Sequence, residues 1–156
     1  MLKNPLLKQA QTKIESGVQD RDAYNRIVQA GTKVIYDKAT FTELSKEIRQ
    51  AQDPVTEIAE GMIGILGILY KQSRKTMPIP AMVMAGMSLL LDALDFAEQA
   101  GLVKIDKAEL NKATTHYLNS LLPKFGLTPD KIDATLGQLG GTIKDPAKMA
   151  QIQGGK

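Results

Sequence analysis

The segment that decides the fold reads MIGILGILY and spans residues 62–70. In a helix it has no polar face, and it completes a predicted helix that begins at Pro54. A helix that is apolar all round must be covered by protein or by lipid. A second apolar segment, from Pro78 to Ala100, follows after the short basic link of residues 71–76. Together the two segments predict an apolar helical hairpin at the centre of the fold.

Capping signals mark both ends of the first core helix. Asp53 precedes Pro54, so an N-cap residue is followed by proline at the first helical position, where no amide hydrogen is needed. Lys71, Arg74 and Lys75 follow the other end, where the helix dipole favours positive charge. These signals predict a helix of about 20 residues.

The hairpin has two possible surroundings, a protein core and a bilayer. A membrane-spanning helix needs about 20 predominantly apolar residues. The clean apolar run of the first segment has nine residues, 62–70, and the second segment is interrupted by Pro80 and ends at Asp92. We therefore expect neither to be an ordinary transmembrane helix, and we favour the core of a bundle, with membrane insertion as the alternative.

Small residues recur on both core helices and indicate close helix contacts. The glycines of the first helix follow one another at intervals of three and leave a shallow groove without side chains. The second helix has an alanine pair spaced by four, as in helices that pack tightly in membranes. The interface predicted for a second copy or a partner comprises Gly61, Gly64, Gly67, Ala81, Met82, Ala85, Gly86 and Met87.

Five of the seven methionines lie in this same region: Met62, Met77, Met82, Met84 and Met87. Methionine is flexible and polarizable, so it fills irregular gaps in cores and also adapts to changing partners. We expect these residues to fill the core. The alternative is a Met-rich groove that binds a partner helix.

The remaining sequence predicts amphipathic helices around the hairpin, and no run alternates in the manner of a strand. The expected N-caps are Asn4, Asp20 or Asp22, Thr40, Asp106 and Thr128, with Glu43 and Glu109 completing capping boxes. Gly31 lies on an apolar stripe, where we expect a close helix contact rather than a ligand. The sequence predicts an all-α bundle of about six helices, a single domain over residues 1–143, and a flexible tail over residues 144–156.

Few residues suggest chemistry, and the P-loop, dinucleotide, zinc and serine-elbow motifs are absent. Asp92, Asp95 and Glu98 share one side of the second core helix, where we expect a solvated face. A helical di-metal site would also need Glu-x-x-His patterns on other helices, and His116 is the sole histidine. We expect His116 to be exposed or hydrogen-bonded. No catalytic residue, metal site or cofactor is predicted, and an enzyme is the third hypothesis.

Composition and net charge limit the classes of partner that the chain can bind. Hydrophobic residues make up 43% of the 156-residue chain and charged residues 24%, as in a globular protein, while the 4% of aromatic residues is typical of a helical core. The net charge of +3 and the pI near 9.0 fall short of a basic stripe, so we expect at most weak, non-specific DNA contact. The absence of cysteine excludes disulfides and thiolate metal sites.

A resemblance adds a functional hypothesis. The cysteine-free helical design around MVMAGMSLLLDALDFAE, residues 82–98, resembles the small internal virion proteins of short-tailed bacteriophages. The resemblance implies a virion protein of the capsid interior or portal vertex, ejected with the DNA to help form a conduit through the host envelope. Its implied partners are other virion proteins, including portal or ejection proteins, and the host membrane. It supplies no catalytic residue.

These observations lead to a ranked expectation. First is a non-enzymatic structural protein that forms homo-oligomers and acts as a phage ejection component. Residues 1–5 turn polar before a signal-peptide core forms, so we expect synthesis in the host cytoplasm. The alternative is a soluble helical adaptor or regulator that binds a partner helix in the Met-rich groove.

Overall fold

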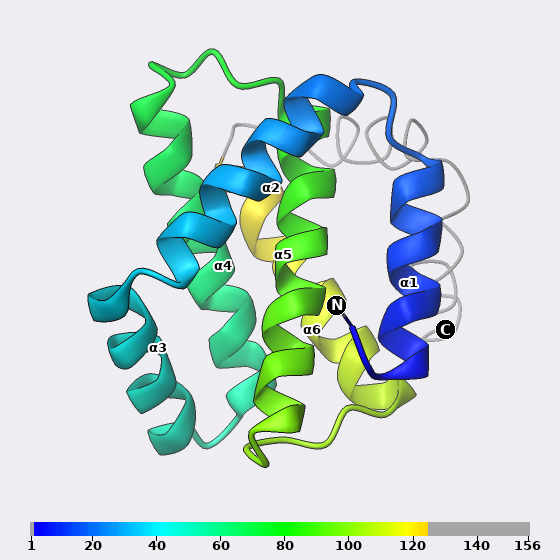
Figure 1. Ribbon diagram of the computed structural model, residues 1–156, viewed down its shortest axis with the longest axis vertical. Coiled ribbons are helices and arrows are strands. Elements are labelled where there is room, and N and C mark those ends of the chain that lie inside the picture. The colour runs from blue at the N-terminus through cyan, green and yellow to red at the C-terminus, as the bar shows by residue number, and fades with distance from the viewer. Residues whose placement is uncertain (1, 125–156) are drawn as a thin grey trace.

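The computed structural model describes residues 2–124, which form six helices and no strand (Figure 1). The all-α prediction is therefore confirmed. The predicted helix after Thr128 and the tail of residues 144–156 lie outside the described residues, so the domain limits remain a prediction. The helices are α1 (Pro5–Ser16), α2 (Arg21–Ile35), α3 (Lys38–Gln50), α4 (Pro54–Gln72), α5 (Ile79–Gln99) and α6 (Lys107–Lys124).

The central helix is α5, which passes through the middle of the bundle (Figure 1). Every residue from 81 to 91 is buried. The helices α1, α2, α4 and α6 all pack against it, and α3 lies outside α4. A helix that is apolar on every side is thus covered by other helices of its own chain.

Helix α5 is also the one helix of residues 2–124 that is long and apolar enough to cross a membrane, with a mean hydropathy of 1.6 over its most apolar window. The expectation that neither core segment would reach this limit is wrong, because Pro80 and Asp92 do not interrupt the helix. Within the fold, 78% of that window is buried. This burial is typical of a core helix.

Hydrogen bonds confirm four of the predicted N-caps. In each case a side-chain oxygen accepts a backbone amide of the first turn. The pairs are Leu6 N with Asn4 Oδ1 at 2.8 Å, Ala23 N with Asp20 Oδ1 at 3.0 Å, Thr56 N with Asp53 Oδ1 at 3.5 Å, and Glu109 N with Asp106 Oδ1 at 2.9 Å.

The predicted N-cap at Thr40 is wrong. Helix α3 begins at Lys38, and Asp37 Oδ2 accepts the amide of Thr40 at 3.4 Å. Aspartate is a better N-cap than threonine, and the extended backbone of Asp37 has the conformation that the position requires. Thr40 is therefore the third residue of the helix rather than its cap.

Gly31 brings α2 against α5. A Cβ atom at this position would overlap the side chain of Leu89 on α5. The close helix contact expected at Gly31 is confirmed.

Candidate assembly surface on α4

Helix α4 packs against α5, α6, α3 and α2. The helix also carries Gly64, which is exposed, Gly67, which is half-buried, and Ile68, whose residue surface is 49% exposed. Residues three and four apart share a face of a helix, so these three are neighbours. We refer to Gly64, Gly67 and Ile68 as the open face of α4.

The three glycines of α4 have different surroundings. A Cβ atom at Gly61 would approach Leu44 Cδ1 of α3 to 3.0 Å, so that glycine already serves a contact within the chain. A Cβ atom at Gly64 or Gly67 would meet no atom within 4 Å. Of the predicted glycine groove, two positions are open to a partner.

The other five predicted interface residues lie in the interior. Gly86 is buried, and the exposures of the other four range from 0% to 6%. They cannot meet a partner while the bundle is closed, because the helices packed around α5 already cover them. These residues are Ala81, Met82, Ala85, Gly86 and Met87.

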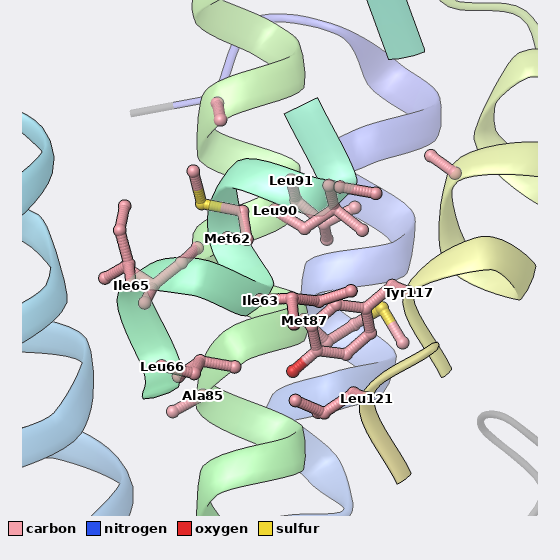
Figure 2. Close-up of a cluster of buried hydrophobic side chains, with 14 of the residues drawn as sticks. Met62, Ile63, Ile65, Leu66, Ala85, Met87, Leu90, Leu91, Tyr117 and Leu121 are labelled. Atoms are coloured by element: carbon pink, nitrogen blue, oxygen red, sulfur yellow. The ribbon is translucent and has the colours of Figure 1, made fainter. Parts of the chain in front are cut away.

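Gly86 allows close contact of α5 with α4 and α6. The hydroxyl of Tyr117 on α6 donates to the carbonyl of Val83 at 3.0 Å, and Figure 2 shows the ring among the apolar side chains of α4 and α5. A Cβ atom at Gly86 would overlap that hydroxyl and Leu66 Cδ1. Burial raises the pKa of Tyr117 well above its usual value, so the phenol remains a neutral donor.

The methionines fill the core, as expected. Met62, Met82, Met84 and Met87 are all 2% exposed or less. Met77 is half-buried against the core cluster. The Met-rich groove of the alternative hypothesis therefore does not occur on the surface of residues 2–124.

The expected solvated face at Asp92, Asp95 and Glu98 is wrong. Asp95 is 6% exposed, and its Oδ1 accepts the backbone amides of Lys3 at 3.1 Å and Asn4 at 3.0 Å. The cause is the chain before α1, which lies over this part of α5. The alignment of these acids on one face was visible in the sequence, but not the segment that covers them.

Glu98 acts in the same way at the other end of the acidic row. It accepts the Asn4 side-chain amide at 2.7 Å and the backbone amide of Ile105 at 2.8 Å. It therefore joins the start of α1 to the connection between α5 and α6. Asp95 and Glu98 therefore hold backbone amides in place.

Asp92 is half-buried beside them. Burial raises the pKa of its carboxyl, and repulsion from Asp95 raises it further. Partial burial, followed by the two aspartates, also raises the pKa of the Tyr36 phenol. Tyr36 stacks on Phe41, which meets Phe96 edge to face at a centroid distance of 5.0 Å.

A buried polar network was missed in the sequence. Ser88 Oγ donates to Gln11 Oε1 at 2.7 Å and accepts the Tyr24 hydroxyl at 3.0 Å. The network therefore links α1, α2 and α5 inside the apolar core. Its only signal in the sequence was a serine within the apolar run of residues 82–91.

His116 on α6 is hydrogen-bonded, as expected. Its Nε2 contacts Glu60 Oε2 on α4, and the same nitrogen lies 3.5 Å from Ser120 Oγ. A catalytic triad uses the two ring nitrogens separately, one for the nucleophile and one for the acid. The arrangement thus links α6 to α4, as does the 3.2 Å ion pair between Lys112 and Asp53.

Metal binding has no candidate site in the described part of the chain, where no three His, Cys, Asp or Glu side chains cluster suitably. Comparisons with protein-family models, with curated proteins and with solved structures found no match. The open face of α4, with Gly64 and Gly67 uncovered beside Ile68, is the candidate assembly surface.

Proposed function

We propose that the protein is a non-enzymatic structural protein that forms homo-oligomers through the open face of α4. The observation that carries the proposal is the uncovered position of Gly64 and Gly67 beside the half-exposed Ile68. The opposite side of the same helix is packed into the core. Bare backbone next to one apolar side chain is suited to the close approach of another helix.

A second copy is the partner that fits this face best. Glu60 and Lys71 flank the open face at its two ends, and both are exposed, with Glu60 also in contact with His116 of α6. In a two-fold antiparallel pairing of α4 helices, Glu60 of each copy lies opposite Lys71 of the other. The glycines then meet near the two-fold axis, where small residues allow the shortest separation.

In this proposal the oligomer is a virion component of the ejection type, located in the capsid interior or at the portal vertex. Its support is the helical design around residues 82–98 and an open helix face suited to assembly. Other partners are portal or ejection proteins and the host envelope, with weak, non-specific DNA contact at most. No catalytic step and no cofactor form part of the proposal.

Substitution at Gly64 tests self-association. Gly64→Leu places a side chain in open space within the chain, so the overpacking cost, on the order of 1–3 kcal/mol, falls on the assembly. Size-exclusion chromatography with light scattering should show an oligomeric parent and a dissociated Gly64→Leu variant. Gln72→Ala, an exposed position on the same helix, is the matched control and should leave the mass unchanged.

Two results contradict the proposal. A parent protein that is monomeric would contradict self-association. If the parent is monomeric and binds a helical peptide that Gly64→Leu no longer binds, the adaptor hypothesis replaces self-association. The peptide would then bind the open face rather than a Met-rich groove. Mass spectrometry of purified virions tests the biological role separately, because absence of the chain from particles removes the virion assignment.

A further inference from the structure

The link between α4 and α5 contains two consecutive residues in the left-handed region, Arg74 with φ 58° and Lys75 with φ 63°. The amide of Arg74 donates to the carbonyl of Lys71 at 2.9 Å, and the amide of Lys75 donates to that of Tyr70 at 2.9 Å. This pair of bonds ends a helix in the Schellman arrangement. Its first left-handed position is usually glycine, because a Cβ atom is unfavourable there.

The end of α5 provides an internal comparison. There the amide of Gly101 donates to Glu98 at 3.0 Å and that of Leu102 to Ala97 at 2.9 Å, with Gly101 at φ 78°. The same arrangement thus uses glycine after α5 and arginine after α4. Backbone strain of this kind concentrates at functional sites, so the side chains of Arg74 and Lys75 require an explanation beyond folding.

The sequence around this link carries only positive charge. Residues 61–91 contain three basic residues, Lys71, Arg74 and Lys75, and no Asp or Glu. Arg74 and Lys75 are exposed, and neither forms an ion pair with another residue of the described chain. Asp20 lines a small pocket with Pro78 and Pro80, and its carboxylate accepts the amide of Ala23.

An apolar segment follows the two cations directly. Met77-Pro78-Ile79-Pro80 leads into α5, with both prolines exposed and with Met77 and Ile79 half-buried against the core. Figure 1 shows the link at the outer end of the bundle, where α4 and α5 are joined. Cations beside a partly exposed apolar segment are suited to an anionic lipid surface. A nucleic-acid site would instead extend the positive charge along a groove or stripe.

We propose that the basic tip, formed by Arg74 and Lys75 with residues 76–80, docks on anionic lipid headgroups while the bundle stays closed. The two cations meet headgroup phosphates, and the exposed Pro78 and Pro80 face the interfacial region, while Met77 and Ile79 keep their contacts with the core. The inference deepens the proposed function and rests on its contact with the host envelope. It requires no insertion of α5, which remains covered by its neighbours.

Vesicle flotation of the full chain tests the proposal. The parent should float with phosphatidylcholine vesicles that contain phosphatidylglycerol and not with phosphatidylcholine alone, and added salt should release it. Arg74→Gln/Lys75→Gln should lower the partition coefficient roughly 30-fold, since each cation near an anionic surface contributes about five-fold. Lys38→Gln/Lys46→Gln removes the same charge from exposed positions on α3 and should cause much less loss.

Other outcomes overturn the proposal. Equal losses in the two double variants would show a general charge effect rather than a site. A tip variant that loses binding to a DNA duplex, but not to anionic vesicles, would assign the tip to nucleic acid.

The single substitution Arg74→Gly separates binding from folding. Glycine relieves the left-handed strain, so this variant should melt at a higher temperature and still bind anionic vesicles several-fold more weakly. Undiminished vesicle binding would assign the tip a purely structural role. Substitutions at the tip should leave the oligomeric mass unchanged. A negative result for lipid binding would therefore not contradict self-association through α4.

Discussion

Burial disfavours the charged form of the Asp92 carboxyl. Its carboxyl is half-buried on α5 beside Asp95, and burial raises its pKa above the ordinary value of 3.8. The folded state therefore holds this proton more tightly than the unfolded state. In that case stability falls as the pH rises from the unfolded pKa through the folded one, and the loss is complete above the folded pKa.

The expected consequence is that Asp92→Asn stabilises the protein at neutral pH. The gain in melting temperature should shrink as the pH falls toward 3.8, where the parent carboxyl is itself protonated. Thermal melts across this range, followed by circular dichroism, measure the effect. Glu43→Gln removes an exposed carboxylate and should change little at any pH. A gain that grows on acidification would contradict the assignment.

At the scale of helices, two glycines of the same hairpin have opposite roles. Gly86 on α5 leaves the space in which the Tyr117 hydroxyl of α6 reaches the Val83 carbonyl. Gly64 on α4 leaves space that no described atom fills. The same substitution at the two positions should therefore change stability in opposite directions.

We predict that Gly86→Ala destabilises the chain by about 1–3 kcal/mol, because the new methyl group overlaps Tyr117 and Leu66 in a packed core. Gly64→Ala should instead stabilise the monomeric fold by about 0.5–1 kcal/mol, the difference in helix propensity. Urea denaturation of both variants at a concentration that keeps the parent monomeric measures the pair. A loss of stability with Gly64→Ala would mean that the open face is covered.

Helix positions were largely predictable from the sequence because they depend on local rules. Asp53 before Pro54 and Asp106 before Glu109 mark starts that the hydrogen bonds confirm. The capping-box spacing of Thr40 and Glu43 predicted a cap at Thr40, whereas the helix is capped by Asp37, three residues earlier. Errors of this kind move a boundary and leave the helix itself in place.

The contacts between helices were less predictable, because a helix that is apolar all round does not indicate which partner covers each side. Five of the eight predicted interface residues are therefore buried in the core. Of the other three, Gly64 and Gly67 have open space beside them. For the same reason Asp95 was placed in solvent, although the segment before α1 covers it. The missing information is tertiary and has no local signal.

At the scale of the molecule, the bundle is closed by polar contacts at the edge of a very apolar core. Helix α1 packs mainly on α5. It is held there by two buried side chains, Leu7 and Ile14, and by the hydrogen bond from Ser88 to Gln11. Its start is fixed by Asp95. Regions with few buried apolar contacts open at the lowest free energy, so α1 is expected to open before α4, α5 and α6, which bury more side chains.

Asp95→Ala tests this order of opening. The substitution leaves the amides of Lys3 and Asn4 without their acceptor, and the loss of such bonds costs about 1–3 kcal/mol. Hydrogen exchange followed by mass spectrometry should show faster exchange in peptides covering α1, and unchanged protection in peptides covering α4 and α6. Glu43→Gln on the outer helix α3 is the control and should exchange like the parent. A uniform acceleration over all helices would show instead that the bundle opens only as a whole, because local opening of α1 cannot expose the amides buried in α4.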